Sequence, residues 1–188
     1  MFDYAGVFPP AELPLDDALT EWHRIRASDD SWLLNRLVVR TEHVELCGSE
    51  PLAIVDGQRE TQGDEAFVEG ETKLRCGGTR IPTVEEVAAF VRRCRDEGRR
   101  FKATAALHHA LPTGGEHGFL NLLAACVFGD EEAMLTTREL ELDADSFRAG
   151  GRSADAAECA RVRRELFASI GSCSFAEPVG ELKALGIL

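Results

Sequence analysis

The sequence predicts an α/β fold in which a parallel sheet is covered by helices, arranged as an abbreviated or partial (β/α) barrel. Apolar, partly β-branched segments alternate with amphipathic segments along the chain, the pattern of repeated strand–helix units. One such unit runs from Lys73 to Lys102, and its 29 positions are close to the ~30 residues of a βαβ motif. The chain has 188 residues, whereas a complete eight-stranded barrel usually needs about 250. We therefore expect a single domain, 1–188, with fewer strands than a closed barrel.

The first part of the chain predicts one helix and two strands. Prolines keep the start extended, and apolar residues then recur at helical spacing until about Ser28. The helical positions are Leu15, Ala18, Leu19, Trp22 and Ile25. The apolar segments 31–39 and 52–55 predict buried strands, and the polar segment 56–65 predicts a loop.

The middle of the chain contains the clearest unit. Segment 66–78 predicts a strand that ends in a double glycine. Thr83 and Glu86 have the spacing of a capping box, which predicts a helix that opens there and stops at Gly98. Segment 99–107 predicts the next strand, parallel to the first.

The last third continues the alternation. Helices are predicted at 118–129 and 153–169, with an ambiguous strand and turn between them at 138–152. Segment 170–175 predicts a last short strand, and a C-terminal helix is expected from about Pro178.

Composition excludes several classes of partner. The formal charge of −12 repels phosphate backbones and anionic membranes, so a nucleic-acid partner is not expected. No apolar run approaches the roughly 20 residues that span a bilayer, and the N-terminal segment lacks the pattern of a secretory signal. These features predict a cytoplasmic protein with no membrane partner.

The cysteines are expected to be reduced and buried. They are Cys47, Cys76, Cys94, Cys126, Cys159 and Cys173. No two of them form a C-x-x-C pair, which argues against a disulfide framework or a structural zinc site. Only Cys76, beside the double glycine, and Cys173 are worth weighing as catalytic groups.

A candidate site follows from strand alternation. Side chains at alternate positions share one face, so Lys102, Thr104 and His108 lie on one side of their strand. The same parity places Lys73 and Arg75 on one side of the preceding strand. Parallel neighbours would direct the three cations, Lys73, Arg75 and Lys102, into one space.

Buried cations are costly unless they are paired or used. The structural explanation is neutralisation by acidic residues such as Glu69, Glu71 or Glu177. The functional explanation is a site for an anion or a carbonyl group, in which a lysine pressed by a second cation loses its proton and forms a Schiff base.

The histidine loop sets a geometric condition. Lys102 and His108 would lie about 20 Å apart in a continuous strand, too far to serve one small substrate. Both can serve only if the strand ends near Ala105. His117 can fold back because Gly114 and its neighbouring glycine allow a tight reversal.

The leading functional prediction is a lyase or isomerase acting on a small anionic or carbonyl substrate. Lys102 would be the nucleophile or general base, and His108 or His117 would transfer protons. The substrate-binding residues would be Lys73, Arg75, Gly77, Gly78 and Thr104. No cofactor is required in this interpretation.

Two alternatives stay open. One is a metal-dependent enzyme that binds a transition metal through His108, His109 and His117, although their spacing matches neither H-E-x-x-H nor a zinc finger. The other is a non-catalytic binding module whose shortened barrel presents an open edge to another chain, including a second copy of itself.

Resemblance to known families adds to these expectations. The segments DYAGVFPP, KLRCGG, FKATAALHH, HGFLNLL and GSCSFAEPVGELKALGIL resemble those of an uncharacterised bacterial protein family with longer members, and 48–71 looks shortened by comparison. Residues 71–107 also resemble part of the deoxyribose-phosphate aldolases, barrel enzymes with a Schiff-base lysine. That resemblance implies that Lys102 is the nucleophile; the strand order and the residue before Gly77 depart from the aldolase pattern.

Overall fold

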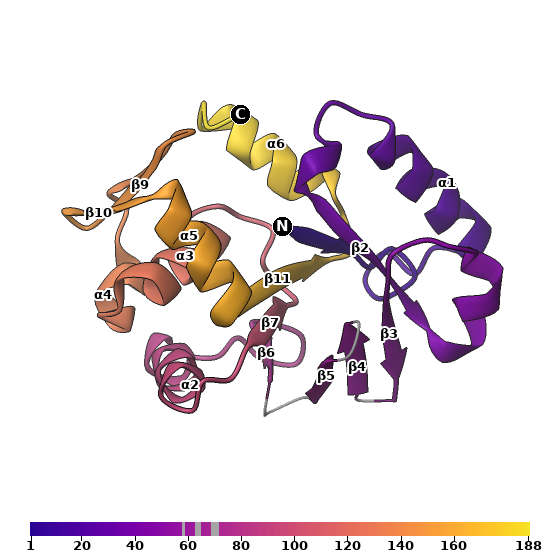
Figure 1. The fold of residues 1–188 in the computed structure, drawn as a ribbon, viewed down its shortest axis with the longest axis horizontal. Helices are drawn as coiled ribbons and strands as arrows, with labels where there is room; N and C mark the ends of the chain where they lie inside the picture. Colours follow the sequence, from indigo (N-terminus) through magenta and orange to yellow (C-terminus); the bar gives the residue numbers. More distant parts are fainter. Residues whose placement is uncertain (58, 63–64, 69–71) are drawn as a thin grey trace.

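The computed structural model describes residues 1–57, 59–62, 65–68 and 72–188, and it confirms an α/β fold built on a curled sheet (Figure 1). The sheet has the order β5-β4-β3-β2-β1-β11-β7-β6. Its strands are β1 (Phe2–Tyr4), β2 (Leu34–Arg40), β3 (Leu52–Asp56), β4 (Arg59–Gln62), β5 (Glu65–Val68), β6 (Lys73–Arg75), β7 (Phe101–Thr104) and β11 (Phe167–Ser172). The pairings β3–β2, β2–β1, β1–β11, β11–β7 and β7–β6 are all parallel, and the sheet forms a partial barrel.

The strand order is that of a (β/α) barrel with one interruption. In a closed barrel, consecutive strands are neighbours and the last strand pairs with the first. Here β1, β2 and β3 form one arc, β6, β7 and β11 form the other, and β11 joins β1 with Ile170 opposite Phe2. The ring is therefore interrupted between β3 and β6.

An antiparallel hairpin occupies the interruption. Strands β4 and β5 extend the sheet from β3, so the loop predicted for 56–65 was wrong, as was the continuous strand predicted for 66–78. The two strands of such a hairpin are joined by backbone hydrogen bonds, which do not depend on the polarity of the side chains. A polar sequence therefore gives no hydrophobic pattern from which these strands could be predicted.

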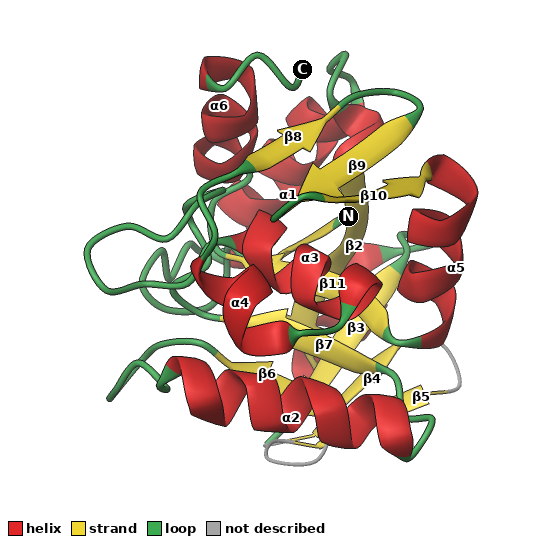
Figure 2. Ribbon diagram, turned by 90° about the vertical axis from the view of Figure 1, so that its left-hand side faces the viewer, coloured by secondary structure: helices red, strands yellow, loops and turns green. Residues whose placement is uncertain are grey.

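Helices surround the curled sheet (Figures 1 and 2). They are α1 (Leu15–Arg26), α2 (Val84–Asp96), α3 (Phe119–Phe128), α4 (Glu131–Thr136), α5 (Ala156–Glu165) and α6 (Ala176–Ala184), with the 3₁₀ segments η1 (Ser31–Leu33) and η2 (Thr41–Cys47). The predicted capping box of α2 is confirmed, with Thr83 and Glu86 each accepting a hydrogen bond from the other's backbone N–H. Gly98 follows that helix with a φ of 61°. None of the helices within the described ranges is long and apolar enough to cross a bilayer.

A second, three-stranded antiparallel sheet contains β8 (Leu140–Leu142), β9 (Ser146–Ala149) and β10 (Arg152–Asp155) (Figure 2). It resolves the ambiguous segment 138–152. Helix α5 begins at Ala156, later than predicted, because Asp155 caps it by accepting from the N–H of Glu158 at 2.8 Å. Neither β1 nor α4 was predicted.

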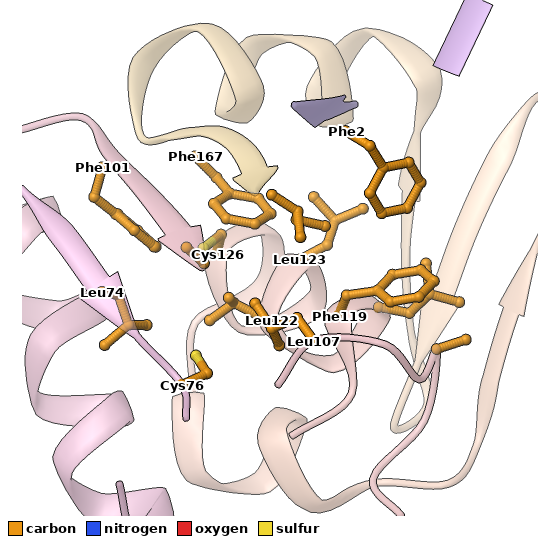
Figure 3. Close-up of a cluster of buried hydrophobic side chains, with 14 of the residues drawn as sticks. Phe2, Leu74, Cys76, Phe101, Leu107, Phe119, Leu122, Leu123, Cys126 and Phe167 are labelled. Carbon is orange, nitrogen blue, oxygen red and sulfur yellow. The ribbon is translucent and has the colours of Figure 1, made fainter. Parts of the chain in front are cut away.

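The apolar core lies between the outer face of the sheet and its helices (Figure 3). Phe2 meets Phe119 of α3 edge to face, with ring centroids 5.4 Å apart. Phe101 packs in the same way on Phe90 of α2, at 5.2 Å. Because Phe2 and Phe101 point outward into this core, strand alternation directs Asp3 and Lys102 to the inner face.

Candidate functional site

A cavity of about 490 Å³ lies at the carboxyl ends of the parallel strands. Its lining includes Lys73, Arg75, Gly78, Lys102, Thr104, His108, Gly171 and Cys173. Ligands of parallel α/β folds bind at this end of the sheet, where loops leave the strands. The sequence-predicted residues Lys73, Arg75, Gly78, Lys102, Thr104 and His108 thus line one cavity, whereas Gly77 and His117 do not line it.

Lys102 forms a buried ion pair with Asp3. Nζ of Lys102 lies 3.0 Å from Oδ2 of Asp3, and the two side chains are 1% and 0% exposed. Asp3 also accepts hydrogen bonds from Asn35 Nδ2 and Ser169 Oγ, each at 2.7 Å. Four strands, β1, β2, β7 and β11, therefore each contribute one group to this network. A buried charge pair is tolerated when hydrogen bonds such as these occupy the remaining acceptor positions of its carboxylate.

The described partner of Lys102, Asp3, is not among the acids named from the sequence. Glu177 lies instead beside His108, with its Oε2 at 2.7 Å from Nδ1 of the ring. Glu69 and Glu71 lie outside the described residues. The sequence missed Asp3 because its strand is three residues long and carries no readable periodicity. The one signal in the sequence for a buried acid at this position was that Asp3 lies between two aromatic residues, Phe2 and Tyr4.

Gly171 makes room for the lysine. It lies opposite Thr104 on one side and Asp3 on the other. A Cβ at this position would come within 2.9 Å of Cε of Lys102 and 3.1 Å of Oγ1 of Thr104. The absence of a side chain on β11 thus allows Lys102 to reach across to β1.

The edge strand β6 brings two more cations to the cavity. Lys73 lies opposite Lys102 and Arg75 lies opposite Thr104 in the parallel register. The three cations predicted to share one space therefore line the same cavity. The cations Lys73 and Arg75 suit this lining to an anionic ligand. Lys102, with Asp3 beside it, suits the lining to a ligand that carries a carbonyl group.

Strand β7 ends near Ala105, as it must if Lys102 and His108 are to contact one small substrate. It stops at Thr104, and Ala105 and Ala106 then adopt left-handed backbone with φ of 65° and 48°. Each such alanine costs about 1 kcal/mol, and strained backbone of this kind clusters at binding sites. The reversal brings His108 to the wall of the cavity that Lys102 also lines.

The double glycine supports this turn. A Cβ on Gly77 would lie 2.3 Å from Cβ of Ala106, so only glycine allows the two segments to pack. Gly78 has a φ of 106° and lines the cavity. Gly77 thus shapes the site without lining it.

The other two histidines contact different parts of the protein. Nδ1 of His109 lies 2.8 Å from Oε1 of Glu181 on α6. His117 is buried, and its Nε2 donates to the carbonyl of Pro82 at 2.8 Å. Across the described ranges, no three His, Cys, Asp or Glu side chains gather in a group that could hold a metal ion. The geometry therefore gives the metal alternative no support.

The two cysteines weighed as catalytic groups are poor nucleophiles. Burial raises the pKa of Cys76 to about 12. Cys173 lines the cavity, and partial burial followed by the charge of Glu177 raises its pKa as well. Both remain protonated near neutral pH, which leaves the lysines as the candidate nucleophiles. All six cysteines are free thiols.

Comparisons with protein-family models, with curated proteins and with solved structures find no match to this chain. The geometry of the cavity and the chemistry of its side chains are therefore the basis for a function.

Proposed function

We propose that this protein is an enzyme that forms a Schiff base between Lys102 and the carbonyl group of a small oxoacid or sugar phosphate, and that it acts as a lyase or isomerase. The observation that carries the proposal is the buried pair of Lys102 and Asp3 at a cavity also lined by Lys73 and Arg75. A lysine used only to fill an ion pair needs no cavity beside it.

Asp3 supplies the proton acceptor that a nucleophilic lysine requires. One proton moves from Nζ of Lys102 to Oδ2 of Asp3 across 3.0 Å, which leaves a neutral amine and a carboxylic acid. The hydrogen bonds from Asn35 and Ser169 hold the carboxyl in place during the transfer.

The covalent step balances with these groups alone. The amine nitrogen bonds to the carbonyl carbon, and after proton transfer from nitrogen to oxygen the adduct is a carbinolamine. Asp3 returns its proton to the hydroxyl group, which leaves as water, and an iminium forms at Lys102. The iminium accepts the electron pair released when an adjacent C–C or C–H bond breaks.

The remaining lining residues have matching roles. Lys73 and Arg75 hold the carboxylate or phosphate of the substrate, because both cations lie on the strand next to Lys102. His108, paired with Glu177, moves protons at the cavity wall. Thr104 and Gly78 contact the substrate.

Reductive trapping tests the proposal with little ambiguity because the chain has only three lysines, Lys73, Lys102 and Lys183. The protein is incubated with pyruvate, glycolaldehyde or glyceraldehyde 3-phosphate, reduced with borohydride, and examined by intact mass and peptide mapping. We expect one adduct, on Lys102. An adduct confined to Lys183, which pairs with Asp30 at the surface, or no adduct with any carbonyl, would contradict the proposal.

A further inference from the structure

The cavity at Lys102 has two unlike sides. The arc of β6, β7 and β11 lines it with charged and polar side chains, whereas the described lining residues from the other arc and from the loop after β1 carry no polar side chain. This second side, called here the apolar wall, consists of Phe8, Pro9, Pro10, Val38 and Val55. We propose that the apolar wall binds an alkyl or aryl group of the substrate whose carbonyl group bonds to Lys102. The proposal deepens the proposed function and rests on it for the identity of the reacting end.

Strand alternation directs two valines of the apolar wall into the cavity. Leu37 and Val39 of β2 belong to the core behind the sheet, so Val38 between them faces inward. On β3, Ala53 lies opposite Val38 in the parallel register, and Val55 is two positions further along the same face. Val38 is 3% exposed and Val55 is half-buried. Because β-branched side chains are stiff, the two valines form a fixed surface at the cavity.

The loop after β1 supplies the rest of the apolar wall. Phe8 is half-buried and lines the cavity, and the guanidinium carbon of Arg40 lies 5.2 Å from its ring centroid. A stacked guanidinium holds the ring in one orientation. Pro9 and Pro10 follow directly, and proline has no backbone N–H. This segment therefore offers a ligand apolar surface with few hydrogen-bond donors.

The apolar wall favours a hydrocarbon group over the hydroxyl groups of a sugar. Side chains of phenylalanine, proline and valine neither donate nor accept hydrogen bonds. A sugar hydroxyl buried against them loses its water without gaining a partner, which is unfavourable. A methylene group buried there gains about fourfold in affinity. Of the two substrate classes named above, the apolar wall therefore favours an oxoacid with an apolar side chain.

Lys102 lies where the two sides of the cavity meet. Its Nζ is 3.0 Å from Asp3, on the strand that leads into the loop of Phe8. A carbonyl carbon bonded to this nitrogen therefore stands between the two arcs, and one of its substituents can extend along the apolar wall. The cavity of about 490 Å³ also exceeds what a three-carbon oxoacid fills. The expected substrate is a 2-oxoacid whose side chain is longer than that of pyruvate.

Reductive trapping with a homologous series of oxoacids tests the apolar wall. Pyruvate, 2-oxobutyrate and 2-oxohexanoate share one reacting end and differ only in the number of methylene groups. For each acid, intact mass gives the concentration at which borohydride labelling of Lys102 is half-maximal. We expect this concentration to be at least about tenfold lower for 2-oxohexanoate than for pyruvate. Equal concentrations across the series, or a preference for pyruvate, would overturn the inference.

Two variants assign the preference to the apolar wall. Phe8→Ala and Val55→Thr should each reduce the ratio of the two half-maximal concentrations, pyruvate over 2-oxohexanoate, by about fourfold or more. Val55→Thr replaces a methyl group by a hydroxyl group of similar size, so it guards against a folding defect in Phe8→Ala. Trp32→Ala is the matched control, because it removes an exposed aromatic side chain that does not line the cavity, and its ratio should equal that of the parent protein. The parent ratio in both wall variants would contradict the assignment.

A ligand without a carbonyl group separates this inference from the proposed function. Benzyl alcohol has an apolar ring and no charge, and ligand-observed NMR measures its binding to the whole chain. We expect it to bind the parent protein and Trp32→Ala, and to bind Phe8→Ala and Val55→Thr more weakly. This pattern without any trapping on Lys102 would overturn the proposed reaction and leave the apolar site standing. Trapping of pyruvate without any preference for the longer acids would overturn the apolar site and leave the reaction standing.

Discussion

Lys102 on β7 and Asp3 on β1 form an ion pair across a strand that lies between them. β11 pairs with both strands, and Gly171 is the residue over which the lysine passes. The ion pair therefore connects the two arcs of the partial barrel at the place where β11 meets β1. Its energetics and its chemistry depend on the same few atoms, which makes it the first target for substitution.

Removing one member of this pair should be costly, and removing both should not. Lys102→Met leaves the buried carboxylate of Asp3 without its cation, so we expect a loss of about 3–5 kcal/mol in the free energy of unfolding. The double variant Lys102→Met/Asp3→Asn should recover most of that loss. Urea unfolding measures both. Lys183→Met, which breaks an exposed pair with Asp30, is the control and should cost less than about 1 kcal/mol.

If Lys102→Met were instead more stable than the parent protein, the buried lysine would destabilise the fold. That result would favour the non-catalytic alternative.

Gly171→Ala should separate folding from lysine chemistry. The added Cβ displaces the flexible end of Lys102 from Asp3, at a cost of about 1–3 kcal/mol for the overpacked site. Borohydride trapping on Lys102 should be lost while the far-ultraviolet circular dichroism remains that of the parent. Gly180→Ala is the control. It lies on α6 with nothing within 4 Å of the new Cβ, and it should stabilise the helix by about 0.5–1 kcal/mol.

Gly77 and Ala106 should behave as a coupled pair. Gly77→Ala brings two Cβ atoms into collision and should destabilise the protein by about 1–3 kcal/mol. Ala106→Gly removes the opposing Cβ and relieves about 1 kcal/mol of left-handed strain. The double variant should be more stable than Gly77→Ala alone. Additive effects in thermal or urea unfolding would contradict the contact.

Thiol labelling should follow burial. Iodoacetamide at about pH 8 should modify Cys159 and Cys173, which are partly exposed, before Cys76 and Cys126, which are buried and have raised pKa values. Mass spectrometry of quenched samples gives the order. Concentrated guanidinium chloride should expose all six cysteines at once. Early modification of Cys76 in the native protein would contradict its place in the core.

The contact between Glu181 and His109 predicts a pH dependence of stability. The hydrogen bond from His109 is the main cause that lowers the pKa of Glu181 below its ordinary value of 4.5. The folded state then holds the proton less tightly than the unfolded state, so this contribution is full above pH 4.5 and is lost as the pH falls further. Glu181→Gln should lower the melting temperature near neutral pH, and the difference should shrink in acid. The exposed substitution Glu45→Gln serves as the reference, and an equal deficit at all pH values would refute the assignment.

Local patterns predicted the elements whose evidence lies within a few neighbouring residues. The capping box at Thr83 located α2, and strand alternation placed Lys73, Arg75 and Lys102 at one cavity. Asp3 was missed because its partner is 99 positions away in sequence and its strand is too short for a pattern. The hairpin of β4 and β5 was missed because backbone pairing, not side-chain polarity, forms it.

The interruption of the ring between β3 and β6 also concerns how the chain assembles. The arc of β1, β2 and β3 lies within residues 2–56 and the arc of β6, β7 and β11 within residues 73–172, whereas the seam of β1 and β11 places Phe2 opposite Ile170. Closing a long loop costs entropy before its contacts form, so the two arcs are expected to fold first and to dock along this seam. The network of Asp3, Lys102, Asn35 and Ser169 spans the seam. The reactive lysine would therefore acquire its partner only when the two halves of the protein meet.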